Sequence, residues 1–206
     1  MAISDKLTQL NNIKSDIKAA IIAKGGTATN DFTTYATAIS NLPSGGGGSD
    51  DLKNLIERDI TSIDIPAGTT KIGTNAFQNC TGLTSVTIPN SVKTIDTNAF
   101  QNCISLTSVT LGNSVRTIDT NAFNNCSKLT SVTIPNSVTT IGSSAFYSCT
   151  GLTSITSLNT TPPKILKSTF QSVPSTCPIY VPAESVEAYK AAANWSTRAD
   201  YIQAIQ

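Results

Sequence analysis

A repeat with a period of 23 residues constrains the fold of this chain more than any other feature. Phe77, Phe100, Phe123 and Phe146 follow one another at this interval, and cysteine and leucine columns keep the same interval. The cysteines are Cys80, Cys103, Cys126 and Cys149, and the leucines are Leu83, Leu106, Leu129 and Leu152. A fixed period of roughly 20 to 50 residues is typical of stacked arrays. We therefore predict a mostly β solenoid over residues 51–175, with 23-residue turns.

Each repeat has too few apolar residues to fold alone, so the repeats must stack to share a core. In one repeat the apolar residues are Leu83, Val86, Ile88, Val92, Ile95, Ala99, Phe100 and Cys103. The segment 85–88 alternates Ser or Thr with Val or Ile, which predicts a short strand with one buried face. Pro89 ends this strand because proline has no N–H to donate to a neighbour.

The repeat pattern stops after Ile155, and residues 176–206 predict a C-terminal cap. An apolar strand over residues 178–181 precedes a helical pattern. The helical apolar positions are Val186, Tyr189 and Ala192, and Trp195, Tyr201, Ile202 and Ile205 continue them as a closing helix.

Residues 1–43 predict a separate α-helical anchor, joined to the repeats by a flexible Gly/Ser linker over residues 44–50. Ser4 caps a helix whose apolar residues are Leu7, Leu10, Ile13, Ile17 and Ile21, and a shorter helix follows it. Two short helices bury little surface, so we expect them to dock on a larger body or to form a homo-oligomer, with a trimer favoured. No apolar run of signal-peptide or membrane-span length precedes the repeats, so we expect synthesis in a cytoplasm and no membrane insertion.

Composition argues against an enzyme and against a nucleic-acid partner. The chain has no histidine, which removes the commonest general base and the imidazole ligands of most catalytic zinc sites. Its net charge of +1 provides no basic field for a phosphate backbone. Asp96 and Asp119 stand at the same repeat position, where we expect their carboxylates to bond the backbone of a turn. We predict no catalytic residues, no cofactor and no metal site.

The pattern Ile-Pro-x-x-Val-x-x-Ile-x-x-x-Ala-Phe-x-x-Cys, seen from Ile88 to Cys103, resembles the BspA-like (Treponema-type) leucine-rich repeat family. Residues 179–189 and Trp195 look like the end cap that often follows such repeats in gut Bacteroidetes proteins. This resemblance implies a curved right-handed solenoid used for adhesion or protein binding, without catalytic residues.

The first forty or so residues are similar to helical modules that open many bacteriophage tail-fibre and virion proteins. That resemblance implies a virion-associated structural or receptor-binding protein, made in the bacterial cytoplasm and attached to other virion proteins by its N-terminal helices. The alternative is a bacterial surface or secreted leucine-rich repeat adhesin. In either case the expected ligand is a protein or glycan on a bacterial or mucosal surface.

The outward strand positions are the candidate binding residues. They form columns of hydroxyl side chains, of which Ser85, Thr87, Ser108, Thr110, Ser131 and Thr133 are the central members. Such columns suit a ligand surface, but the same residues also suit a strand that only faces water. The repeats place no aromatic residue in these columns, which argues against a tight lectin. We expect the four repeated cysteines to be buried thiols that pack as small apolar groups.

Overall fold

The computed structural model describes residues 61–65 and 67–206. The predicted anchor residues Leu7, Leu10, Ile13, Ile17 and Ile21 and the Gly/Ser linker lie outside these residues. In the described part, no helix has the length and apolar character needed to cross a membrane.

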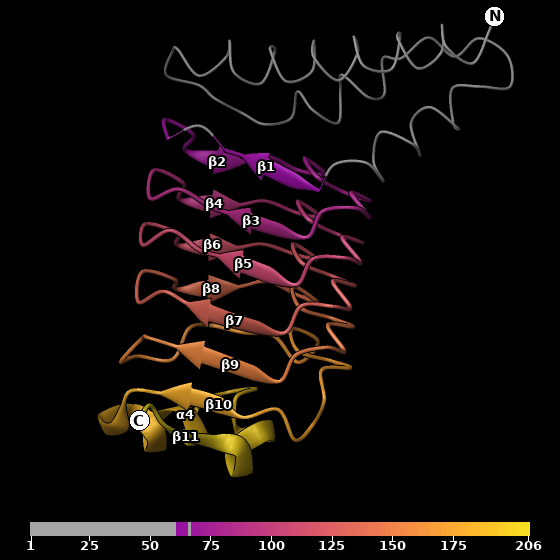
Figure 1. The fold of residues 1–206 in the computed structure, drawn as a ribbon. Helices are drawn as coiled ribbons and strands as arrows, with labels where there is room; N and C mark the ends of the chain where they lie inside the picture. The colour runs from indigo at the N-terminus through magenta and orange to yellow at the C-terminus, as the bar shows by residue number, and fades with distance from the viewer. Residues whose placement is uncertain (1–60, 66) are drawn as a thin grey trace, which may run out of the picture.

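The repeats stack as successive coils, and their short strands build two parallel sheets (Figure 1). The larger sheet has seven strands in the order β1-β3-β5-β7-β9-β10-β11. Its members are β1 (Ser62–Asp64), β3 (Ser85–Thr87), β5 (Ser108–Thr110), β7 (Ser131–Ile134), β9 (Ser154–Ser157), β10 (Ile179–Val181) and β11 (Ile202–Ala204). This arrangement confirms a repeat solenoid. The strand expected at 85–88 ends one residue early, although the Ile88 N–H still donates to the carbonyl of Thr110 at 2.8 Å.

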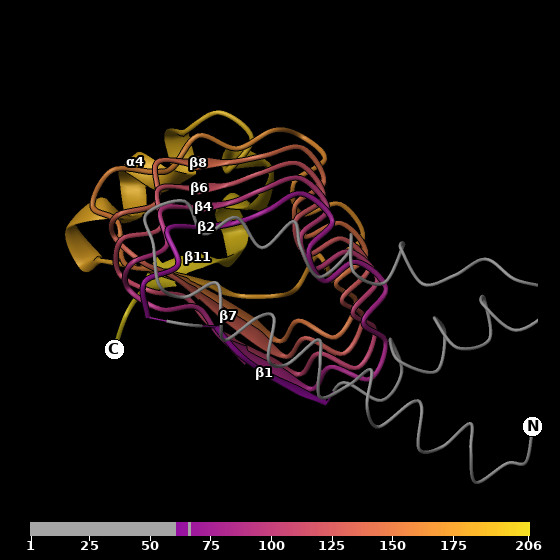
Figure 2. The same cartoon turned by 90° about the horizontal axis from the view of Figure 1, so that it is seen from above.

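A second sheet of four strands covers the other side of the core (Figure 2). It consists of β2 (Lys71–Ile72), β4 (Thr94–Ile95), β6 (Thr117–Ile118) and β8 (Thr140–Ile141). Each strand pairs in parallel with its equivalent one repeat later, as Ile72 does with Ile95 and Ile95 with Ile118. The sequence does not predict these strands, because two residues are too few to show an alternating pattern.

Residues in left-handed backbone conformation form a corner of the coils, and in most coils these residues are asparagines. In the first three complete coils they are Asn75, Asn98, Asn121, Asn79, Asn102 and Asn125, with φ between 56° and 64°. Asparagine tolerates this conformation better than other residues with a Cβ atom. The side-chain amides also connect the coils: Asn98 Nδ2 donates to Asn75 Oδ1 at 2.9 Å, and Asn102 Nδ2 donates to Asn79 Oδ1 at 2.8 Å.

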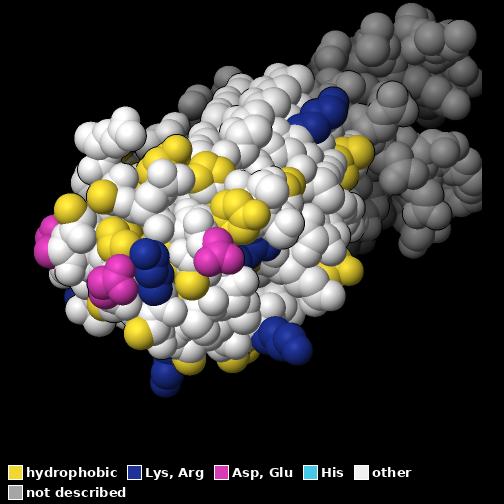
Figure 3. Space-filling view, turned by 90° about the horizontal axis from the view of Figure 1, so that it is seen from below, with side chains coloured by type: hydrophobic (Ala, Val, Ile, Leu, Met, Phe, Trp, Pro, Cys, Tyr) yellow, Lys and Arg dark blue, Asp and Glu magenta, His cyan; other side chains and the backbone are white. Residues whose placement is uncertain are grey.

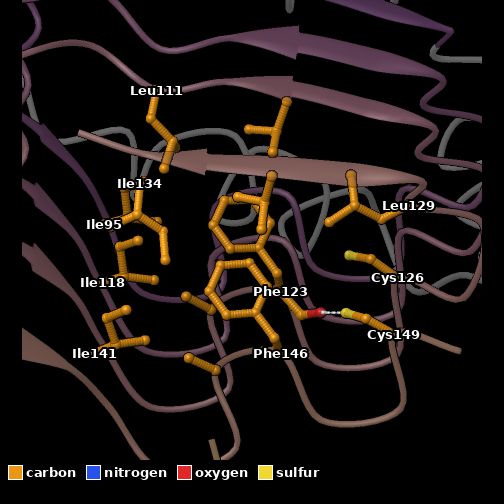
Figure 4. Close-up of a cluster of buried hydrophobic side chains, with 14 of the residues drawn as sticks. Ile95, Leu111, Ile118, Phe123, Cys126, Leu129, Ile134, Ile141, Phe146 and Cys149 are labelled. Atoms are coloured by element: carbon orange, nitrogen blue, oxygen red, sulfur yellow. Dashed lines mark hydrogen bonds between the residues drawn. The ribbon is translucent and has the colours of Figure 1, made fainter. Parts of the chain in front are cut away.

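A column of stacked aromatic rings runs through the core (Figure 4). Phe100 and Phe123 are fully buried, and their ring centroids lie 5.2 Å apart with the rings nearly parallel. The eight apolar residues predicted for the repeat that starts at Leu83 are all buried. One fixed side chain per coil therefore contacts its own equivalent in the next coil, which holds all coils in the same register.

The last part of the chain departs from the prediction in two ways. Phe170 continues the ring column 5.6 Å from Phe146, so one further coil follows the point where the sequence pattern stops. Ile202, expected in a closing helix, instead lies in strand β11 and pairs with Ile179 of β10. Its apolar side chain is buried and its backbone completes the sheet, so tertiary pairing overrides the local helical spacing.

Three short helical segments accompany the final strands. They are η2 (Ala183–Ser185), α4 (Val186–Ala191) and η3 (Ser196–Tyr201), of which η2 and η3 are 3-10 helices. Tyr189 of α4 and Trp195 enter the core, and their rings meet edge to face at 5.1 Å. The Trp195 indole N–H donates to the carbonyl of Pro163 at 2.8 Å, which ties the last segment to the preceding loop.

Candidate ligand-binding face

The predicted hydroxyl columns lie on the outer face of the seven-stranded sheet. In its register Ser85 pairs with Ser108, Ser108 with Ser131, and Thr87 with Thr110. Equivalent side chains on neighbouring parallel strands stand about 5 Å apart. All six candidate residues are exposed: Ser85, Thr87, Ser108, Thr110, Ser131 and Thr133. Strand geometry therefore produces the expected grid, while its role in binding stays a prediction.

A third column of hydroxyls, which the sequence analysis missed, stands just before these strands. The side chains of Thr84, Thr107, Thr130 and Thr153 each donate a hydrogen bond to a backbone carbonyl one repeat earlier, at 2.9 to 3.1 Å. These four residues are exposed, but their hydroxyl groups already donate hydrogen bonds between coils. The 23-residue period is enough to reveal this column, whereas only the structure shows which carbonyls accept its hydrogen bonds.

Tyr180 adds an aromatic side chain at the end of the columns, although the repeats themselves have none there. In β10, Ile179 and Val181 are buried while Tyr180 is half-buried, so its side chain is on the outer face. Tyr180 pairs with Thr156 on one side and with Gln203 on the other, which places it at the end of the threonine column. No repeat spacing connects residue 180 with residue 156, so only the tertiary structure could bring them together.

Apolar residues continue this corner of the face. The residues that directly follow β9, β10 and β11 are Leu158, Pro182 and Ile205. Leu158 is 43% exposed and Ile205 is 39% exposed, although large apolar side chains are normally covered in a repeat core. Exposed apolar side chains beside a tyrosine are typical of the centre of an interaction surface. We call the six residues Thr156, Tyr180, Gln203, Leu158, Pro182 and Ile205 the β9–β11 corner.

The four-stranded sheet has a different, charged surface. Lys93 and Arg116 are exposed, and the ammonium group of Lys71 pairs with the Asp96 carboxylate at 3.2 Å. The Asp119 carboxylate accepts the backbone N–H of Thr120 at 2.7 Å, as expected for a turn residue. The pairing of Asp96 with a lysine was not expected. Each carboxylate thus has a local partner.

The repeated cysteines act as hydrogen-bond donors within the core. All five cysteines of the chain are described, all are buried, and none forms a disulfide. Each thiol in the middle of the stack donates to a phenylalanine carbonyl of the previous coil: Cys103 to Phe77 at 3.2 Å, Cys126 to Phe100 at 3.3 Å and Cys149 to Phe123 at 3.2 Å (Figure 4).

Burial keeps these thiols protonated. It raises the pKa of Cys103 and Cys126 well above the ordinary value, and it raises the pKa of Cys149 to about 12. A neutral thiol is a poor nucleophile and a poor metal ligand. Among the described residues, no group of three His, Cys, Asp or Glu side chains could hold a metal ion. The expectation of buried, structural thiols is confirmed, with the addition that they bond the backbone.

Solved structures similar to this chain are bacterial leucine-rich repeat proteins. The leucine-rich repeat protein of T. pallidum shares 26% identity, with a TM-score of 0.53 over 60% of this chain and 59% of that chain. The pneumococcal vaccine antigen PcpA shares 21% identity, with a TM-score of 0.55 over 70% of this chain and 40% of that chain. A leucine-rich cell surface protein of Faecalibacterium prausnitzii shares 31% identity, with a TM-score of 0.41 over 52% of this chain and 35% of that chain.

The matched part of the chain therefore spans 59%, 40% and 35% of the length of these three relatives, less than two thirds in each case. No curated protein matches the chain in sequence. Residues 55–177, more than half of the chain, match the family described as BspA type leucine-rich repeat region, in six copies. Together with the stacked coils and the buried Phe and Cys columns, this match shows that the chain belongs to the BspA-type leucine-rich repeat family.

Proposed function

We propose that this protein is a non-enzymatic, adhesin-type binding protein that holds a macromolecular ligand on the outer face of its seven-stranded sheet. The family is a repeat fold for protein interaction and is generally non-enzymatic. The observation that carries the proposal is the composition of this face. From β3 to β9 its outward strand residues are exposed or half-buried Ser and Thr, and the β9–β11 corner adds a tyrosine and exposed apolar groups.

The shape of this surface favours a broad ligand over a small one. A flat grid of hydroxyls provides many weak hydrogen bonds, and a corner with Tyr180 and Leu158 provides the desolvated contact that most often dominates binding energy. The outward residues of β3 to β9 carry no charge, so long-range attraction contributes little and shape must provide specificity. A protein or a glycan on a bacterial or mucosal surface meets these requirements.

Binding of the full chain to immobilised host matrix proteins and to an array of bacterial and mucosal glycans tests this proposal. For any ligand that binds, Thr133→Glu on the large sheet should weaken binding by at least about tenfold, because it places a charge in a neutral contact. Thr117→Glu, on the four-stranded sheet, is the matched control and should bind within about twofold of the parent. Equal binding by both variants would rule out the large sheet as the contact surface.

For location, we propose the bacterial cell surface, and the virion is the competing interpretation. The virion interpretation depends on residues 1–43, which lie outside the described part, whereas family membership supports the surface protein. An antibody against residues 61–206 separates the two when it is applied to intact cells and to purified phage particles from the source strain. Labelling of intact cells supports the proposal, and labelling confined to particles would replace it with a virion role.

A further inference from the structure

A cleft lies away from the sheet face, between the loop that follows Lys164 and the C-terminal segment around η3. Its volume is about 690 Å³, within the range of roughly 300 to 1,000 Å³ that small-ligand pockets occupy. The side chains that matter for its chemistry are Ile165, Leu166 and Lys167 from the loop and Trp195, Arg198 and Tyr201 from the C-terminal segment. No role in the fold or in the proposed function accounts for this cleft.

Apolar surface is open to solvent in this cleft. Leu166 is 55% exposed, the highest exposure among the large apolar side chains that the structure describes. The floor is aromatic, because the rings of Phe170 and Trp195 pack at 5.5 Å beneath it. Tyr201, which is half-buried, also lines the cleft. An apolar or aromatic group entering here would cover Leu166 and displace water from the exposed surface.

The charge of the cleft is positive. Lys167 and Arg198 line it, and no Asp or Glu is among its lining residues. Figure 3 shows that acidic side chains do occur on this end of the molecule, but they do not enter the lining. A ligand in the cleft therefore meets two cations, and none of the described residues that line the cleft is a carboxylate.

Arg198 is held by backbone carbonyls and has no acidic partner among the described residues. Its guanidinium donates to the carbonyls of Pro174, Phe170 and Val173 at 2.9 to 3.0 Å. These contacts use three of its five N–H groups. In the described part of the chain, no carboxylate lies within ion-pair distance of it. Arg198 is half-buried, and only carbonyl dipoles compensate its positive charge. An anion bound nearby would therefore be stabilised by electrostatic attraction to the guanidinium.

We propose that this cleft binds a small amphipathic anion, with an apolar or aromatic body against Leu166 and Tyr201 and an acidic group toward Lys167 and Arg198. The site is separate from the large sheet, so it would act whether or not that sheet binds a macromolecule. The chemical class follows from three features of the lining: an exposed leucine, aromatic walls and uncompensated positive charge.

Fluorescence titration with 8-anilinonaphthalene-1-sulfonate tests this site, since the probe combines aromatic rings with one anionic group. The matched control probe is N-phenyl-1-naphthylamine, which has the same rings without the sulfonate. We expect the sulfonate probe to bind the folded full chain at one site and more tightly than the neutral probe. Lys167→Glu should lower the affinity for the sulfonate probe by about threefold to tenfold, because it reverses an exposed charge beside the anion. The affinity for the neutral probe should stay nearly unchanged.

Leu166→Ser should weaken both probes, because it removes the apolar wall without changing the charge. Both substitutions are at exposed side chains, so the variants should keep the parent melting temperature. Lys128→Glu, an exposed lysine outside this cleft, is the control for a general charge effect. The proposal would be overturned if Lys128→Glu and Lys167→Glu lost the same affinity for the sulfonate probe. It would also be overturned if Lys167→Glu and Leu166→Ser both bound the probes as the parent does.

Discussion

The hydroxyl of Tyr189 lies 2.7 Å from the hydroxyl of Ser157, and both side chains are fully buried. Ser157 pairs with Ile134 of the previous coil, a position that is aliphatic in every earlier complete coil. The Tyr189 hydroxyl also donates to the carbonyl of Asn159 at 3.2 Å. The last coil therefore carries a polar residue in the core where the phenol of α4 enters, and we expect the two positions to be energetically coupled.

Tyr189→Phe should lower the free energy of unfolding by about 1 to 3 kcal/mol, because it leaves buried polar groups of the last coil without a partner. The double variant Tyr189→Phe/Ser157→Val should recover part of this loss, since the Ser157 hydroxyl is then absent too, while the Asn159 carbonyl still lacks its donor. Urea unfolding of the parent, both single variants and the double variant gives the coupling energy. Additive losses would show that the two hydroxyls do not interact.

The stability of the fold should decrease at alkaline pH. Burial raises the pKa of Cys149 from 9.0 to about 12 and the pKa of Tyr189 from 10.0 to about 12. Above pH 9 the unfolded chain loses these protons first, so it binds fewer protons than the folded chain and is favoured as pH rises. The stabilisation is thus complete below pH 9 and is lost progressively toward pH 12.

Urea unfolding at several pH values between about 7 and 11 measures this effect. Cys149→Ala should be less stable than the parent at neutral pH, because it removes a buried side chain and its bond to Phe123. Its stability should also fall less steeply with pH, since one of the titrating groups is gone. A parent protein with the same stability at pH 8 and pH 11 would contradict the argument from burial.

Ser148→Asn should stabilise the protein by about 0.5 to 1 kcal/mol. Ser148 has φ of 56° at the position where the three earlier coils have Asn79, Asn102 and Asn125. Asparagine tolerates this backbone better, and its amide could join the ladder in which Asn125 Nδ2 donates to Asn102 Oδ1 at 3.0 Å. The reverse substitution Asn125→Ser is the matched control and should destabilise the protein. Thermal unfolding measures both effects. An unchanged melting temperature in both variants would refute a stabilising role for asparagine at this left-handed position of the coil.

Gly112→Ala should destabilise the fold by about 1 to 3 kcal/mol. A Cβ atom at residue 112 would lie 2.5 Å from the carbonyl oxygen of Pro89 in the previous coil. Proline stands at the equivalent positions 89 and 135, so comparison of the repeats alone would suggest that a larger residue is tolerated. Pro135→Ala keeps a Cβ and is the control, for which we expect a smaller loss in denaturant unfolding. A larger loss in Pro135→Ala would contradict the close approach seen at Gly112.

The central coils could be predicted from the sequence because each of their contacts repeats. A residue at one position meets its own equivalent one period away, so the contact of Phe100 with Phe123 follows once the period is known. The exposed grid that includes Ser108 and Thr110 follows in the same way from strand alternation. The cysteine bonds to carbonyls did not follow, since they depend on the position of each thiol relative to the backbone of another coil.

The sequence by itself determined the repeat, its core positions and its outward hydroxyl columns, because these depend on spacing that every coil shares. Tertiary structure alone decided the positions of Tyr180, Ile202 and Arg198, which belong to no repeat. Their partners are set by how the last segment folds back against the final coils, where burial and strand pairing outweigh local preference. The β9–β11 corner and the cationic cleft both arise there, at the end of the stack where the repetition stops.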